Sequence, residues 1–160
     1  MHTKVTTRQE LASRLEERRR QGQRIVFTNG CFDLMHIGHI RYLQAARNLG
    51  DVLVVGVNSG ESVRALNKGT DRPIVPDAQR AEVLAALACV DYVVTFSEPD
   101  PGALIATLQP DILVKGGDWS VDRIVGRETV EARGGRVQTI PLVPGVSTTT
   151  LVQRIRSTTA

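Results

Sequence analysis

Cysteine, lysine and aromatic residues are scarce in this sequence, and these shortages exclude several classes of protein. The 160 residues include only two cysteines, Cys31 and Cys89, which form no C-x-x-C pair. Neither a disulfide framework nor a zinc site is indicated, and a reducing compartment such as the cytoplasm suits both thiols. Aromatic residues make up 4%, too few for the basic and aromatic surface typical of nucleic-acid binding. We expect a cytoplasmic protein without a nucleic-acid partner.

Long apolar runs are absent as well. No stretch approaches the ~20 consecutive apolar residues that a membrane-spanning helix needs. The opening residues, MHTKVTTRQE, lack the apolar core of a secretory signal, so we expect no membrane partner. Hydrophobic residues at 41% and charged residues at 23% are typical of a globular protein, and a length of 160 residues suits a single domain.

Arginine dominates the positive charge. Seventeen of the 20 basic residues are arginines, and the formal net charge is +3. The densest cluster, at residues 18–20, suits the last turn of a helix, where positive charge offsets the negative end of the helix dipole. Thr7 and Glu10 form the pattern of a capping box ahead of Leu11 and Leu15. Residues 1–23 are therefore predicted to contain an accessory helix.

From residue 24 onward, apolar runs of strand length alternate with stretches of helical spacing. The runs cover residues 25–27, 52–57, 92–94, 112–114 and 137–140. Helical spacing covers residues 37–49, 77–88, 102–108 and 147–155, and more weakly 123–132. Continuous rather than alternating runs indicate strands that are covered on both faces. The sequence predicts an α/β fold, a doubly wound, Rossmann-like parallel sheet of about five strands with helices on both faces, in one domain.

The first strand-to-helix junction carries the densest pattern of candidate site residues. Residues 27–39 read FTNGCFDLMHIGH, and ligands of doubly wound sheets bind beyond the carboxyl ends of the strands. Gly30 and Gly38 allow a tight loop and close approach of a ligand. The helix that starts near Gly38 would point the positive end of its dipole at that loop. An anion site is predicted there.

His36 and His39 lie three residues apart at the start of this helix. Both rings can aim N–H groups at one phosphate, and the helix dipole favours their neutral forms. The alternative is a surface histidine beside a capping residue. A zinc site is weakly supported, because the third histidine is His2 and no cysteine or carboxylate stands at metal spacing from the pair.

The segment GCFDLMHIGH resembles the signature of the nucleotidyltransferase superfamily that contains the cytidylyltransferases and pantetheine-phosphate adenylyltransferase. Further matching segments follow in the same order: NKGTDRP at 67–73, QR at 79–80, LVKGGD at 113–118 and GVSTT at 145–149. The resemblance covers residues 24–156 and is strongest to the heptose 1-phosphate adenylyltransferases. It implies a nucleotidyltransferase domain over residues 24–160.

The resemblance also implies an activity. Enzymes of this kind move AMP from ATP, with Mg²⁺, to D-glycero-β-D-manno-heptose 1-phosphate, and release ADP-heptose and pyrophosphate for the lipopolysaccharide inner core. Similar enzymes often form homo-oligomers. One alternative is a CTP-dependent cytidylyltransferase acting on a polyol or amino-alcohol phosphate. A second alternative is a nucleotide-binding module without catalysis.

Site residues follow from the same resemblance. The catalytic residues implied are His36, His39 and Lys68. The nucleotide-binding residues implied are Thr28, Asn29, Gly30, Cys31, Phe32, Gly38, Arg80, Gly116, Asp118, Ser147, Thr148 and Thr149. The substrate-binding residues implied are Asp33, Arg72 and Lys115, and no protein ligand to a metal is assigned.

Several of these residues have a structural alternative. Lys68 is either an arm over the β- and γ-phosphates or a solvated lysine. Arg80, near the start of a helix that Asp77 is expected to cap, is a second candidate for binding phosphate, whereas Arg72 is a weaker candidate whose alternative is to brace the loop. Residues 147–149 precede the last predicted helix, where they bind pyrophosphate or cap the helix. Asp33 binds the sugar or Mg²⁺, and Lys115 holds the sugar phosphate. Alternatively, each of the two is a buried partner in a structural ion pair. Leu142 stands where a related cytidylyltransferase has a phosphate-binding arginine, which disfavours the CTP alternative.

Overall fold

The computed structural model describes residues 3–67, 69–117 and 119–158, so the site candidates Lys68 and Asp118 lie outside the described residues. Five parallel strands form one sheet in the order β3-β2-β1-β4-β5. The strands are β1 (Ile25–Gly30), β2 (Val52–Asn58), β3 (Tyr92–Phe96), β4 (Ile112–Gly116) and β5 (Arg136–Ile140). Each of the five predicted apolar runs lies in one of these strands. The predicted fold class is confirmed.

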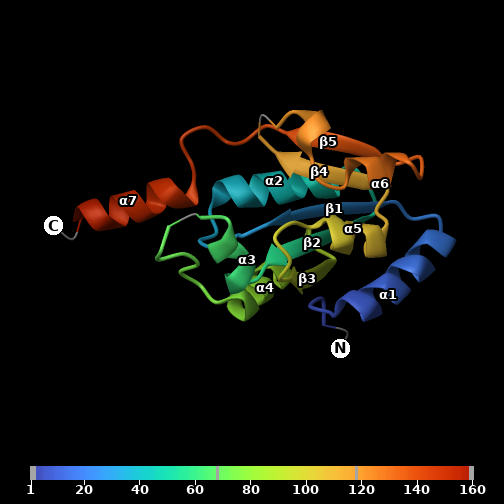
Figure 1. Cartoon of the computed structure of the whole chain (residues 1–160), viewed down its shortest axis with the longest axis horizontal. Helices are drawn as coiled ribbons and strands as arrows, with labels where there is room; N and C mark the ends of the chain where they lie inside the picture. The colour runs from blue at the N-terminus through green and yellow to red at the C-terminus, as the bar shows by residue number, and fades with distance from the viewer. Residues whose placement is uncertain (1–2, 68, 118, 159–160) are drawn as a thin grey trace.

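Helices cover both faces of the sheet (Figure 1). They are α1 (Arg8–Arg20), α2 (Ile37–Arg47), α3 (Gly60–Ala65), α4 (Asp77–Ala85), α5 (Gly102–Leu108), α6 (Arg127–Glu131) and α7 (Thr148–Thr158), with a short 3-10 helix at Val121–Arg123. One buried apolar cluster joins α1, α5 and α6 to the sheet, and a second joins α2 and α4 to it. All seven residues of β2 are buried, which explains why the strand is apolar from Val52 to Val57.

Helix α1 begins with the predicted capping box. The Thr7 side chain accepts a hydrogen bond from the backbone N–H of Glu10, and the Glu10 side chain accepts one from the backbone N–H of Thr7. Leu11 and Leu15 are fully buried in the same cluster as the residues of α5. Burial of two leucines contributes roughly 1.5–3 kcal/mol each. The first helix therefore forms part of the core that covers one face of the sheet.

The structure corrects the sequence prediction at the starts of two helices and adds one helix. Asp77 is the first residue of α4, and Pro76 before it provides no side-chain cap, so the predicted Asp77 cap was wrong. Helix α7 starts at Thr148, so Thr148 and Thr149 lie in its first turn and only Ser147 precedes it. Helix α3 was not predicted, because six residues are too few to show helical periodicity.

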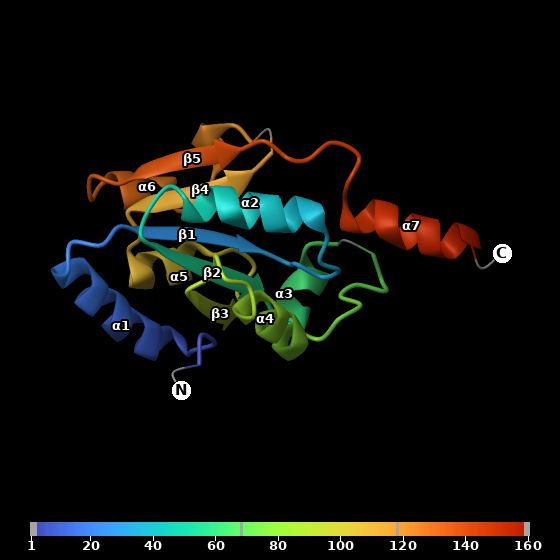
Figure 2. The ribbon, with the colours of Figure 1, turned by 180° about the vertical axis from the view of Figure 1, so that it is seen from behind.

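Helix α7 projects beyond the body of the molecule, past the start of α2 (Figures 1 and 2). Only Thr148 is buried along its length. Arg156, near its far end, forms an exposed ion pair with Asp71. No helix within the described residues has the length and apolar character needed to cross a membrane.

The two halves of the sheet separate at the carboxyl end of β1. Six residues of β1, Ile25–Gly30, are in register with residues of β2. In the described part of the chain, β1 pairs with β4 only at Val26 and Phe27. Beyond Phe27 the two strands open, at the point where a doubly wound sheet binds its ligand.

Candidate active site

A cavity of about 500 Å³ lies beyond the carboxyl ends of β1 and β4. Its walls come from the loop after β1, the start of α2, the segment before α7 and the first turn of α7. Thirteen residues expected at the site line it: Asn29, Gly30, Cys31, Phe32, Asp33, His36, Gly38, His39, Arg72, Gly116, Ser147, Thr148 and Thr149. The structure therefore brings most of the predicted site residues together in one place.

His36 and His39 form the first turn of α2 as a reciprocal pair. The Nδ1 atom of His36 accepts a hydrogen bond from the backbone N–H of Gly38 at 3.1 Å. The Nδ1 atom of His39 accepts one from the backbone N–H of His36 at 3.3 Å. The two rings stack, with centroids 3.8 Å apart and planes inclined by 22°. Histidine thus takes the place of the usual Ser, Thr, Asp or Asn cap.

This arrangement fixes the proton on each neutral ring. Because Nδ1 of both His36 and His39 accepts a backbone N–H, the proton of the neutral imidazole lies on Nε2. Burial lowers the pKa of His36, and two stacked positive rings would repel each other. The lowered pKa favours the neutral form of His36, and the neutral form of each ring carries its proton on Nε2. Of the two alternatives at this position, His36 performs the capping role and still lines the cavity.

Gly38 is needed to accommodate the ring of His36. A Cβ at Gly38 would lie 2.9 Å from both Cε1 and Nδ1 of His36, which is closer than real Cβ contacts. The backbone of Gly38 also supplies the N–H that holds this ring. The glycine therefore allows the histidine to fold back onto its own helix.

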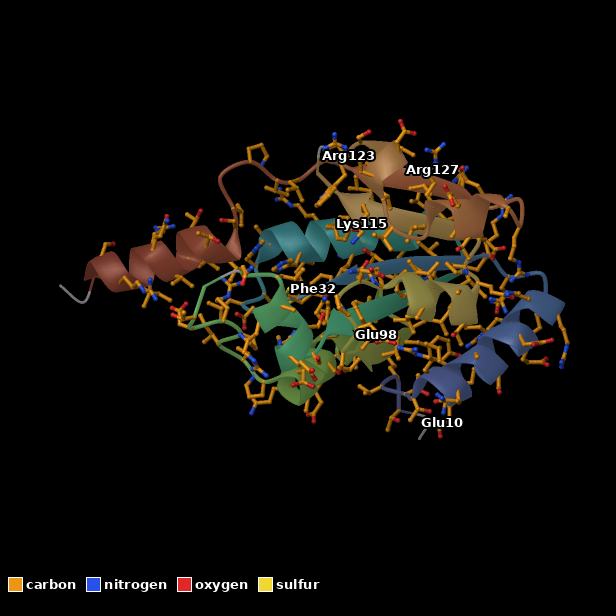
Figure 3. All side chains as sticks on the ribbon, viewed as in Figure 1. Glu10, Phe32, Glu98, Lys115, Arg123 and Arg127 are labelled. Atoms are coloured by element: carbon orange, nitrogen blue, oxygen red, sulfur yellow. The ribbon has the colours of Figure 1, made fainter. Side chains whose placement is uncertain are left out.

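Phe32 shapes the loop between β1 and α2 (Figure 3). Its backbone has a φ of +48°, in the left-handed region that non-glycine residues rarely adopt. The ring is 6% exposed and packs edge-on against His39, with centroids 5.3 Å apart. A Cβ at Gly30 would meet the Phe32 ring at 3.0 Å. The unfavourable backbone conformation of Phe32 thus accompanies a ring position that supports His39 from one side.

The segment before α7 supplies the opposite wall. The Ser147 hydroxyl accepts a hydrogen bond from the backbone N–H of Thr150 at 3.0 Å, so Ser147 caps the helix. The Thr148 hydroxyl donates to the carbonyl of Leu34 at 3.2 Å and ties α7 to the loop after β1. Thr149 is exposed and lines the cavity. The positive end of an 11-residue helix therefore faces the cavity across from the histidines.

Asp33 is committed to a structural cluster. Its carboxylate accepts hydrogen bonds from Arg72 Nε at 2.7 Å and from the backbone N–H groups of Ile74 and Val75 at 2.8 to 3.0 Å. The side chain of Asp33 is 0% exposed and that of Arg72 is 11% exposed. Of the alternatives for Asp33, this geometry favours the structural ion pair.

Three expected residues lie outside the lining of the cavity. Arg80 is 1% exposed, and its guanidinium donates to the carbonyl oxygens of Val75, Cys31 and Asn58 at 2.6 to 2.8 Å. Burial lowers its pKa. Arg80 therefore braces the backbone behind the loop and does not line the cavity, while its buried NH2 atom has no hydrogen-bond partner in the part of the chain that the structure describes.

Thr28 and Lys115 are the other two. Thr28 is fully buried, and its hydroxyl lies 2.6 Å from the hydroxyl of Tyr42. The Lys115 ammonium, on β4 (Figure 3), donates to the Asn29 side chain at 2.9 Å and bridges the gap between β1 and β4. Asn29 itself lines the cavity. Thr28 and Lys115 therefore hold the strands in place around the site.

Tyr42 lines the cavity and was not identified from the sequence. Its hydroxyl contacts Thr28 on β1 and donates to the carbonyl of Val114 on β4 at 3.3 Å. Burial raises the pKa of Tyr42 to about 12. Its spacing could have identified it, because Tyr42 follows His39 by three residues and so lies on the same face of the helix. This tyrosine anchors α2 to both halves of the sheet.

Apolar side chains form the remaining wall. Leu142, Val143 and Val146 line the cavity, and Leu142 packs over two glycines. A Cβ at Gly116 would lie 3.1 Å from Leu142, and one at Gly117 would lie 3.3 Å from it. The base site expected at the glycines therefore has an aliphatic wall.

Comparisons with known proteins agree with this geometry. The Cytidylyltransferase-like family model matches residues 27–154. The chain is 55% identical over 153 residues to Bifunctional protein HldE of Syntrophotalea carbinolica and 53% identical over 154 residues to that of Geotalea uraniireducens. Each match covers 96% of this chain but 31% of the relative, so the chain spans about a third of the length of these proteins.

Solved structures give the same assignment. The lipopolysaccharide core biosynthesis protein from Thermoplasma volcanium is 30% identical, with a TM-score of 0.64 over 76% of this chain and 98% of that one. Pantoate-beta-alanine ligase from Francisella tularensis, at 16% identity and a TM-score of 0.60, covers 88% of this chain and 67% of that one and shares the fold. The chain belongs to the cytidylyltransferase-like family and is a nucleotidyltransferase.

Proposed function

We propose that this nucleotidyltransferase moves AMP from ATP to D-glycero-β-D-manno-heptose 1-phosphate and produces ADP-heptose and pyrophosphate. The observation that carries the proposal is the stacked pair His36 and His39, in which each Nδ1 atom accepts a backbone N–H, so that the proton of each neutral ring lies on Nε2. Two neutral donors at a helix N-terminus suit an α-phosphate on which negative charge builds up.

The reaction proceeds by direct displacement. A phosphate oxygen of the sugar phosphate forms a bond to the α-phosphorus of ATP, and the bond from that phosphorus to the oxygen that bridges to the β-phosphorus breaks. Pyrophosphate leaves with the electron pair of that bond. The histidines stabilise the α-phosphate and the leaving oxygen, because their Nε2–H groups are already oriented before reaction. No enzyme-bound adenylyl group is needed.

The choice of ATP and heptose phosphate rests on the relatives. The proteins named Bifunctional protein HldE are 53 to 55% identical to this chain, and a similar structure is named for lipopolysaccharide core biosynthesis. The alternative CTP enzyme is disfavoured because Leu142 is apolar where a related cytidylyltransferase carries a phosphate-binding arginine. A non-catalytic binding module would have little need for two donors aimed at the α-phosphate.

The roles of the other residues are part of this proposal. The amides around Gly30 and Gly38, the side chain of Asn29 and the start of α7 hold the phosphates. Gly116 and Leu142 bound the base. Lys68 would contact the β- and γ-phosphates and Asp118 the nucleotide, and both assignments rest on the family resemblance.

Magnesium would arrive with the triphosphate. No group of three or more His, Cys, Asp or Glu residues within the described chain is arranged to hold a metal ion, and both oxygens of Asp33 already accept N–H groups. Phosphate oxygens and water therefore provide the natural ligands. Bound there, Mg²⁺ neutralises charge on the departing pyrophosphate.

Two further expectations belong to this proposal. Both substrates are small phosphorylated metabolites, which suits a cytoplasmic enzyme. Similar enzymes often form homo-oligomers, so light scattering on the purified chain should give a mass above that of a monomer of 17.5 kDa.

A substrate grid tests the function. ATP, CTP, GTP and UTP are each combined with heptose 1-phosphate, glycerol 3-phosphate and phosphocholine, and pyrophosphate release is measured. Release with ATP and heptose 1-phosphate, at least tenfold above every other pair, is expected. Preference for CTP with a polyol phosphate would replace the proposal by its first alternative, and nucleotide binding without release in any pair would replace it by the second.

A further inference from the structure

Asp33 lies in the loop after β1, and its carboxylate is engaged by other groups of the protein. The side chain is 0% exposed. Its Oδ1 atom accepts N–H groups of Ile74 and Val75 at 3.0 and 2.8 Å, and its Oδ2 atom accepts Arg72 Nε at 2.7 Å and Ile74 N–H at 2.9 Å. A carboxylate with two donors on each oxygen has little capacity for a further ligand.

The partners of Asp33 all come from one segment 39 to 42 residues later in the chain. Arg80 holds the same segment from behind, because its Nε donates to the carbonyl of Val75 at 2.8 Å while NH1 donates to the carbonyl of Cys31 at 2.6 Å. The backbone on both sides of the contact is therefore fixed to the phosphate-binding loop.

Arg72 is the residue of this segment that reaches the cavity. It lines the cavity together with the two histidines, and Asp33 engages only its Nε atom. A guanidinium has five N–H donors in a rigid plane. Fixing Nε therefore orients the terminal NH1 and NH2 groups, which suit a phosphate. A long side chain without this contact would spend much of its time in other rotamers.

We propose that Asp33 is a positioning residue that aims the Arg72 guanidinium at a phosphate group in the cavity, and that Asp33 itself touches neither sugar nor metal. This inference rests on the proposed function in one respect, which is that the phosphate is taken to belong to a substrate. The phosphate belongs to ATP or to the sugar 1-phosphate, and the two are separated by experiment.

Steady-state kinetics on Asp33→Asn, Arg72→Ala and the double variant test the pair. Each single variant should raise KM at least tenfold for the same one substrate, with a smaller change in kcat. The double variant should be no worse than Arg72→Ala, because Asp33 acts through Arg72. The substrate whose KM rises identifies the phosphate.

A control separates positioning from general stability. Asp91 forms a smaller and more exposed arginine–carboxylate cluster at the amino end of the sheet, where it pairs with Arg47 at 3.1 Å and accepts the Leu53 N–H at 2.8 Å. Asp91→Asn should lower the melting temperature and leave both KM values unchanged. If Asp33→Asn does not fold, Arg72→Ala and Arg72→Lys carry the test, and an unchanged KM in Arg72→Ala overturns the proposal.

Two other results would also overturn it. One is an additive double variant, in which Asp33 acts independently of Arg72. The other is an altered Mg²⁺ requirement in Asp33→Asn with normal behaviour of Arg72→Ala, which would make Asp33 a metal ligand. Stabilisation of the wild type by inorganic pyrophosphate or phosphate, and its loss in both single variants, tests the pair even if no substrate pair in the grid releases pyrophosphate.

Discussion

The backbone N–H of His36 donates to Nδ1 of His39 at 3.3 Å, so the first histidine of the pair fixes the proton on the second. His36 in turn is fixed by the N–H of Gly38. Each ring is thus held by the backbone of the helix turn to which it belongs. The donors that we assign to the α-phosphate are therefore set in place when the helix forms.

Replacing either histidine should reduce turnover much more than nucleotide binding. His36→Ala and His39→Ala are each expected to lower kcat by ~10²–10³, because preorganised donors act mainly in the transition state. Pyrophosphate release and ATP affinity by calorimetry give the two values. Thr7→Ala, which removes the cap of α1 far from the cavity, should leave kcat unchanged. Wild-type turnover in either histidine variant would remove that residue from catalysis.

Gly38→Ala should impair catalysis without unfolding the protein. The added methyl group would lie 2.9 Å from two atoms of the His36 ring and force the ring to move. We expect kcat to fall at least tenfold, since each 1.4 kcal/mol of lost transition-state stabilisation is a factor of ten. Gly60→Ala is a matched control near a helix start, because its Cβ would lie 3.3 Å from the end of the flexible Arg64 side chain and at an ordinary contact distance of 3.7 Å from Pro73. Equal activity of both variants would contradict the fit described for Gly38.

Acid should destabilise the protein partly through His36. Burial lowers the pKa of this ring in the folded state, whereas the unfolded chain binds the proton near the ordinary value of about 6.5. The unfolded state then holds more protons, so stability contributed by neutral His36 is present above that value and is lost as the pH falls below it. Urea unfolding at pH 7.5 and 5.5 should show a smaller loss for His36→Asn than for the wild type. An identical loss would show that another group is responsible.

Tyr42→Phe should cost stability and disturb the site together. The change leaves the Thr28 hydroxyl and the Val114 carbonyl without the tyrosine partner. The free energy of unfolding should fall by about 1 kcal/mol, as measured by chemical denaturation. Adding Thr28→Val should recover part of that loss, because both polar partners are then removed. A double variant that is less stable than Tyr42→Phe would contradict the stabilising contact that we assign to the Thr28 and Tyr42 hydroxyls.

Much of the fold was accessible from the sequence because burial on both faces imposes a simple pattern. Residues 52–57 of β2 form an unbroken apolar run because helices cover both faces of the sheet. The spacing of His36, Gly38 and His39 likewise allowed the histidine pair to be predicted, because helix capping involves residues that are close in sequence. Helix boundaries were less accurate, as at Asp77 and Thr148, where several neighbouring residues are chemically able to start a helix.

The rest of the site depends on contacts between distant segments. Nothing near Asp33 in sequence indicates that its partners lie 39 to 42 residues away, so sugar, metal and ion pair stayed open alternatives. Arg80 was predicted as a phosphate ligand because arginine suits phosphate, and nothing in the sequence indicated that three backbone carbonyls accept hydrogen bonds from its Nε and NH1 atoms. The purpose of Gly38, to admit a neighbouring ring, also emerged only in three dimensions.

The short pairing between β1 and β4 has a consequence for how this protein folds. Among the residues that the structure describes, the halves of the sheet are joined by two register pairs, Val26 with Ile112 and Phe27 with Leu113. These pairs connect segments that are far apart in the chain. Contacts of long sequence separation form late, since a large loop must close before they contribute. The β1-β2-β3 half can assemble from its own neighbouring segments, whereas the cavity requires both halves. Nucleotide binding should therefore be acquired in the last phase of refolding, after most of the helical signal has returned.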